Sequence, residues 1–246
     1  MKILSLDIET TPNMVYTWGL FDQNIGLNQI VEPGGVVCVA AKFMDEKKTH
    51  FTSVWEHGKQ GMAERIHALL EEADVVMHYN GRRFDLPHLN TIFLEHGLGQ
   101  PKPFADIDLL TVVRRQFKFP SNKLEYVSKA LGLSGKAETG GFGLWVGVME
   151  GDPKAQAKMK KYNIRDVTVL EEMYEILKPW IPNHPNTPLY DGIEGALVCP
   201  VCTSDHVQRR GVYRTAVSVF QQYQCQGCTK WFRGPRRLPK VTKAIQ

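Results

Sequence analysis

Short runs of apolar residues, broken by turn-forming residues, dominate the first half of the chain. Residues 3–8 are mainly apolar and predict a buried strand, which a turn at residues 10–13 would end. Similar runs predict further strands at residues 15–18, 36–43, 49–55, 75–79 and 106–110.

Apolar residues at helical spacing alternate with the later strands. In residues 62–73, for example, Met62, Ile66 and Leu69 fall on one face. The same periodicity predicts further helices at residues 85–95, 111–117, 123–131 and 155–177. Consecutive strands followed by alternating helices and strands indicate an α/β fold, with a mixed sheet flanked by helices.

The chain changes character after residue 178. Four prolines between residues 179 and 188 predict an extended linker, which we place at 179–196. The linker would join a large domain, residues 1–178, to a small C-terminal unit, residues 197–246.

The composition is that of a globular protein outside the membrane. Apolar residues make up 43% of the chain, and no apolar run approaches the roughly 20 residues that cross a bilayer. Asp7 and Glu9 interrupt the apolar start of the chain, which argues against a signal peptide. We therefore expect a soluble intracellular protein, cytoplasmic or associated with the nucleoid, that is not secreted.

The formal charge of +4 is unevenly distributed. Residues 190–246 hold nine Lys and Arg against three Asp and Glu, a net of 9 − 3 = +6, which leaves −2 for the remainder. A basic C-terminal segment on a slightly acidic larger domain suggests a separate element that binds a polyanion.

Four of the five cysteines lie in this tail as two CxxC pairs, 22 residues apart. In an intracellular chain, paired CxxC motifs indicate zinc rather than disulfides. Four thiolates complete a tetrahedral Zn²⁺ site with no open position, so the zinc would be structural. We expect a zinc ribbon around a hairpin of residues 207–213 and 217–223. The expected zinc ligands are Cys199, Cys202, Cys225 and Cys228.

Two acids follow each other closely at the end of the first strand. Residues i and i+2 of a strand point to the same face, so Asp7 and Glu9 project together while Ile8 faces the core. Two adjacent carboxylates repel each other unless a cation is present, and hard divalent cations prefer oxygen ligands.

A third acid, Asp85, is expected at the next junction between a strand and a helix. A carboxylate is favoured near a helix N-terminus. Before it in the sequence, Phe84 would anchor the turn in the core, and three polar residues would face a phosphate backbone. These are Asn80, Arg82 and Arg83.

The predicted helix at 155–177 contributes Tyr162 and Asp166. Their spacing of four places the phenol and the carboxylate on one helical face. That face would point to the sheet edge where the first two acids emerge. In this order and on these elements, the acids suggest a single catalytic site.

These motifs resemble those of the DEDD exonucleases, which have the ribonuclease H-like fold and include the proofreading domains of DNA polymerases. The matching residues are Asp7-Ile8-Glu9-Thr10, Asn80-x-x-x-Phe84-Asp85 and Tyr162-x-x-x-Asp166. The last pattern places the chain in the tyrosine branch, since the histidine branch would carry His where this chain has Lys161. The resemblance covers residues 1 to about 177.

The resemblance implies two-metal hydrolysis of phosphodiesters by two Mg²⁺ or Mn²⁺ ions about 3.5–4 Å apart. Asp7 would bridge the metals, Glu9 and Asp166 would hold the one that activates water, and Asp85 would support the other. Tyr162 would orient the attacking water. The implied activity is that of a 3′-5′ exonuclease releasing 5′-mononucleotides from DNA, with single-stranded DNA or a DNA 3′ end as substrate.

Glycines between residues 132 and 143 predict a mobile loop. Phe142 and Trp145, in or just after this loop, either stack on a terminal base, a contact worth about 1–3 kcal/mol, or close the loop onto the core.

Other functions remain open. An enzyme that trims RNA 3′ ends fits the same motifs, since no motif tests for a 2′-hydroxyl. In an adaptor, the nuclease fold would be a scaffold, and the ribbon would bind DNA or a replication or repair protein. The ribbon's arginines and aromatic residues fit a nucleic-acid contact, and docking onto a protein is the alternative.

Overall fold

The computed structural model describes residues 1–133, 141–193 and 195–239. It divides into two compact units, one of Lys2–Tyr174 and one of Glu175–Gln246 with Met1. Most of the loop predicted to be mobile, residues 134–140, lies outside the described residues. Within the described parts of the chain, no helix combines the length and apolar character that crossing a bilayer requires.

The larger unit is built on a five-stranded sheet in the order β5-β4-β1-β6-β7. β1 pairs antiparallel with β4 and parallel with β6, so the sheet is mixed. This confirms the predicted fold class. The strands are β1 (Ile3–Thr10), β4 (Val36–Phe43), β5 (His50–Ser53), β6 (Val75–His78) and β7 (Ala105–Asp108).

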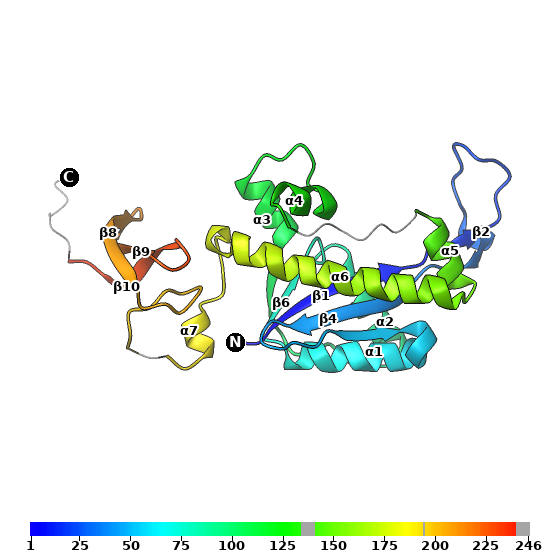
Figure 1. The fold of residues 1–246 in the computed structure, drawn as a ribbon, viewed down its shortest axis with the longest axis horizontal. Helices are drawn as coiled ribbons and strands as arrows, with labels where there is room; N and C mark the ends of the chain where they lie inside the picture. The colour runs from blue at the N-terminus through cyan, green and yellow to red at the C-terminus, as the bar shows by residue number, and fades with distance from the viewer. Residues whose placement is uncertain (134–140, 194, 240–246) are drawn as a thin grey trace. The chain divides into compact units, whose positions relative to one another are not determined.

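Helices cover both faces of this sheet, with α6 along one side and α1 along the opposite side (Figure 1). Two short strands, β2 (Met14–Val15) and β3 (Ile30–Glu32), form a separate ladder. The helices are α1 (Val54–Glu72), α2 (Asp85–Glu95), α3 (Leu109–Gln116), α4 (Leu124–Ala130), α5 (Gly143–Met149) and α6 (Pro153–Leu177).

The alternation of side chains along β1 determines what each face carries. Leu4, Leu6 and Ile8 enter a core shared with α1 and α2. Ser5 points the other way, and its hydroxyl donates to the carbonyl of Val167 on α6 at 3.5 Å. Every second residue of β1 is therefore presented to α6.

The strands predicted at residues 49–55 and 15–18 end earlier in the structure, and one helix was not predicted. The strand expected at residues 49–55 ends at Ser53, whose hydroxyl accepts from the N–H of Glu56 and begins α1 eight residues earlier than predicted. The strand expected at residues 15–18 ends at Val15, and Trp18 is 99% exposed. Helix α5 was not predicted at all.

The smaller unit contains a three-stranded antiparallel sheet in the order β10-β9-β8. The predicted hairpin corresponds to β8 and β9, and the third strand was missed. The proline-rich segment holds two short helical turns, η2 and α7. The elements are η2 (Lys178–Trp180), α7 (Thr187–Tyr190), β8 (Val207–Arg214), β9 (Val219–Cys225) and β10 (Trp231–Arg237).

Candidate active site

The two acids of β1 lie on the face of the sheet that α6 covers. Ile8, between them, is buried on the opposite face. Asp7 and Glu9 are both half-buried. Their partners across the sheet on β4 are Ala40 and Cys38. The two carboxylates therefore lie on the same face of β1, as the alternation along the strand predicts.

Asp85 reaches the same region from the start of α2, where its side chain is 4% exposed. The backbone N–H of Ile8 donates to Asp85 Oδ1 at 3.1 Å, which ties the helix start to β1. The turn before it is closed by the carbonyl of Asn80, which accepts from the N–H groups of Arg83 and Phe84 at 3.0 and 3.2 Å.

Helix α6 presents Tyr162 and Asp166, both buried, toward these acids. Between them lies Asn163, whose amide donates to Asp7 Oδ2 at 2.6 Å and to the Asp7 carbonyl at 3.2 Å. The sequence analysis missed Asn163. The available signal was a polar residue one position after Tyr162 and three before Asp166, in the middle of an amphipathic helix.

The structure brings three of the four predicted acids into one cluster. Carboxylate oxygens of Asp7, Glu9 and Asp166 lie within 4.8 Å of one another. Asp85 lies outside this group, but its charge acts on Asp7. A set of carboxylate oxygens is the donor type that Mg²⁺ and Mn²⁺ prefer. The arrangement of side chains therefore fits a divalent cation.

Burial and mutual repulsion perturb these acids strongly. Burial raises the pKa of Asp7 well above its usual range, and the charges of Asp85, Asp166 and Glu9 raise it further. Burial likewise raises the pKa of Asp85 to about 6. Without a cation, the cluster is an unfavourable concentration of negative charge that favours protonation.

Tyr162 is held in place by packing as well as by the helix. Its ring meets Trp145 edge to face with ring centroids 6.4 Å apart, and both residues join the core cluster between α5 and α6. Burial raises the pKa of the Tyr162 hydroxyl, and the neighbouring acids raise it further. Trp145 thus closes onto the core, whereas Phe142 is 66% exposed.

A fully buried histidine supports the turn that precedes α2. His78 Nδ1 accepts from the N–H of Gly81 at 3.0 Å, and His78 Nε2 lies 2.7 Å from Asp106 Oδ1. The other oxygen of Asp106 accepts from Arg82 Nε at 2.5 Å. Of the two arginines predicted to contact phosphate, Arg82 is therefore paired with an acid, while Arg83 is exposed.

The prediction that Phe84 anchors this turn in the core was wrong. Phe84 is 40% exposed, and its ring packs on His88 with centroids 4.8 Å apart. Asn80 adopts a positive φ of 72°, which changes the course of the chain after β6. The buried anchor of the turn is His78 instead.

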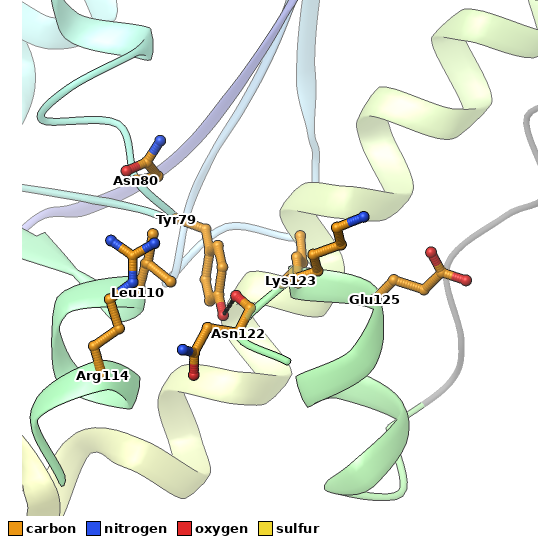
Figure 2. Close-up of a pocket in the computed structure, with 8 residues that line it drawn as sticks. Tyr79, Asn80, Leu110, Arg114, Asn122, Lys123 and Glu125 are labelled. Carbon is orange, nitrogen blue, oxygen red and sulfur yellow. Dashed lines mark hydrogen bonds between the residues drawn. The ribbon is translucent and has the colours of Figure 1, made fainter. Parts of the chain in front are cut away.

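A pocket of about 500 Å³ lies where β6 and β7 end. Because β1, β6 and β7 are parallel, their carboxyl ends share one edge of the sheet, the usual place for a ligand. Asn80 lines the pocket and begins the turn to Asp85. Figure 2 shows Arg114 extending from α3 toward the side on which Asn80 lies, while Lys123, just before α4, lies on the other side of Tyr79. The lining residues are Tyr79, Asn80, Leu110, Arg114, Asn122, Lys123, Leu124 and Glu125.

In the smaller unit, the sulfur atoms of all four tail cysteines lie within 4.8 Å of one another. Cys199 Sγ lies 3.6 Å from Cys228 Sγ, and Cys202 Sγ lies 3.6 Å from Cys225 Sγ. Tetrahedral zinc with Zn–S bonds of about 2.3 Å would require S···S separations of about 3.8 Å. The side-chain geometry therefore fits a closed zinc site.

Comparison with known proteins identifies the larger unit by sequence and by fold. Residues 4–178 match a family described as the RNase_H superfamily. No curated protein matches the chain significantly. Among solved structures, the chain is similar to the family B DNA polymerase of the hyperthermophilic archaeon Pyrobaculum calidifontis, with 18% identity and a TM-score of 0.56. The match covers 72% of this chain and 24% of the polymerase, so the chain corresponds to about a quarter of that protein.

Proposed function

The chain belongs to the RNase_H superfamily, and on this basis we propose that it is a metal-dependent 3′-5′ exonuclease that hydrolyses DNA and releases 5′-mononucleotides. The observation that carries the proposal is the convergence of Asp7, Glu9 and Asp166 within 4.8 Å at a sheet edge. Asp85 and Tyr162 would complete the site, and their presence supports assignment to the tyrosine branch of the DEDD exonucleases.

Divalent metal is the cofactor that these side chains fit best. The cluster is partly buried and made of acids whose charges raise the pKa of Asp7, so bound cations would relieve their repulsion. Asp7, Glu9, Asp85 and Asp166 would hold two Mg²⁺ or Mn²⁺ ions. Such ions lower the pKa of a bound water and neutralise charge on the reacting phosphate.

Tyr162 acts as a hydrogen-bond donor in this proposal. Burial and the neighbouring acids raise the pKa of its hydroxyl above the usual range, so the phenol stays protonated at neutral pH and cannot serve as a base. It orients the attacking water while Asn163 fixes the carboxylate of Asp7.

The pocket at the ends of β6 and β7 would give the nucleic acid a path, because Asn80 lines it and begins the turn that leads to Asp85. Arg114 and Lys123 line this pocket and supply two cations for contacts with phosphates. Arg83 is free to add to these contacts, and the exposed ring of Phe142 could stack on a terminal base.

Zinc has a separate, structural role in the proposal. A unit of this size buries little core, so metal binding would supply much of its folding free energy. Cys199, Cys202, Cys225 and Cys228 would bind one Zn²⁺. Metal analysis of the purified chain should find one zinc per molecule, and its absence would remove this part of the proposal.

Cleavage of 5′-labelled single-stranded DNA and of RNA of the same sequence tests the proposed activity. With Mg²⁺ or Mn²⁺ we expect a ladder that shortens from the 3′ end, faster for DNA, and no ladder from Asp7→Ala. Faster cleavage of the RNA would instead make the chain an RNA-trimming enzyme, and cleavage of neither polymer would refute the proposal.

A further inference from the structure

The sheet of the smaller unit has one buried face and one open face. On β9, Tyr223 and Cys225 are buried on the side of the cysteine cluster. The alternate residues of this strand, Phe220, Gln222 and Gln224, therefore point to the other side. Cross-strand pairing identifies their neighbours on β8 and β10. We call this side the open face. It consists of Gln208, Tyr213, Phe220, Gln222, Gln224, Trp231, Arg233 and Arg237.

The open face offers flat rings and positive charge together. Trp231 is 49% exposed and Tyr213 is 45% exposed. The guanidinium of Arg233 lies 4.3 Å from the ring centroid of Phe220 and 5.8 Å from that of Tyr213, so the plane of stacked groups is already assembled. The three strands contain six arginines and no Asp or Glu.

This combination matches the chemistry of an unpaired nucleic-acid strand. Exposed aromatic rings and guanidinium planes stack on bases whose faces are accessible, as they are in single strands but not in a duplex. Arginines neutralise phosphates, and the glutamine amides can donate to and accept from base edges.

We propose that the open face binds single-stranded nucleic acid, with bases stacked on Trp231 and Tyr213 and phosphates paired with its arginines. That this strand is the enzyme's own substrate rests on the proposed nuclease function. The binding itself is independent of cleavage and can be measured without it.

The test is fluorescence anisotropy with short labelled oligo(dT), oligo(U) and a DNA duplex, using the full chain with Asp7→Asn to prevent cleavage. Added to this background, Trp231→Ala should raise the Kd for oligo(dT) by about 5- to 100-fold, and Trp231→Phe should restore most of the affinity. Arg233→Gln should weaken binding and make the slope of log K against log salt shallower by about 0.7.

Two matched substitutions control for the loss of a ring or a charge. Trp180→Ala removes a tryptophan of similar exposure, 52%, outside the sheet. Arg209→Gln removes an arginine from the same sheet, but on the face that carries its partner Tyr223. Both should change the Kd less than twofold. Zinc content must match the parent for every variant, and Trp231→Phe covers the case in which the alanine variant misfolds.

Equal binding by the parent, Trp231→Ala and Arg233→Gln would overturn the inference. The inference would also be overturned if the duplex bound as tightly as oligo(dT) and Trp231→Ala changed neither affinity. That result would indicate that binding depends only on the charge of the phosphate backbone. Cleavage by the wild-type chain is assayed separately. If the wild-type chain does not cleave but Trp231→Ala loses binding, the nuclease proposal is refuted and the open-face proposal stands. If the wild-type chain cleaves but Trp231→Ala binds as tightly as the parent, the nuclease proposal stands and the open-face proposal is refuted.

Discussion

Asn163 holds Asp7 at two points, its side-chain amide donating to the Asp7 carboxylate at 2.6 Å and to the Asp7 carbonyl at 3.2 Å. Asn163 is fully buried, so this contact is shielded from water and sets the orientation of the central acid of the cluster. It also connects α6, the source of two site residues, directly to β1.

Asn163→Ala should therefore lower activity without removing any acid. Partners that orient metal ligands typically contribute 10- to 100-fold in metal affinity or activity, so we expect kcat to fall by about that factor and the Mg²⁺ concentration for half-maximal rate to rise. Asn90→Ala, at an exposed position of α2, is the control. Unchanged Mg²⁺ dependence in Asn163→Ala would argue against a positioning role.

Tyr162→Phe removes one hydroxyl and keeps the ring that packs on Trp145. We expect kcat to fall by about 10- to 100-fold because the attacking water loses its orienting donor, while KM and the Mg²⁺ requirement stay close to wild type. Tyr174→Phe removes a buried hydroxyl elsewhere on α6 and should leave kcat intact. Equal activity of the two variants would exclude a role for the Tyr162 hydroxyl.

Asp85→Asn should stabilise the metal-free protein while reducing its activity. The pKa of Asp85 rises from 3.8 to about 6 on folding, so between those pH values the folded state binds more protons and the free energy of unfolding falls as pH rises. At pH 7 without Mg²⁺ the variant should be more stable by up to about 3 kcal/mol, and near pH 3, below the unfolded-state pKa of 3.8, the difference should largely disappear. Urea denaturation at both pH values measures this, and a less stable variant at pH 7 would contradict it.

The turn before α2 depends on a glycine. A Cβ at Gly81 would lie 2.4 Å from the ring of His78, which is buried and cannot move away. Gly81→Ala should therefore destabilise the protein by about 1–3 kcal/mol. At Gly99 a Cβ meets nothing within 4 Å, so Gly99→Ala should be neutral or slightly stabilising. Similar thermal midpoints for the two variants would show that the turn can absorb the methyl group.

Local periodicity was enough to predict the faces that two pairs of site residues occupy. Alternation along a strand placed Asp7 and Glu9 on one face, and helical spacing did the same for Tyr162 and Asp166. Asn163 escaped prediction because its burial depends on a partner, Asp7, far away in the sequence. The prediction that Phe84 points into the core was wrong because the positive φ of Asn80, which changes the course of the chain, has no unambiguous sequence signal.

The third strand of the smaller unit was missed for a similar reason. Gly234 and Pro235 interrupt its sequence pattern, and the register with β9 shifts between Arg233 and Arg237. Proline is tolerated there because β10 is an edge strand, where one row of backbone groups has no ladder partner.

The central claim is that the acids act on a free 3′ end, and it is tested most directly with linear and covalently closed circular single-stranded DNA of the same sequence. With Mg²⁺, the proposed exonuclease should shorten the 5′-labelled linear strand stepwise from its 3′ end and leave the circle intact. Cleavage of the circle, or shortening from the 5′ end, would contradict the claim.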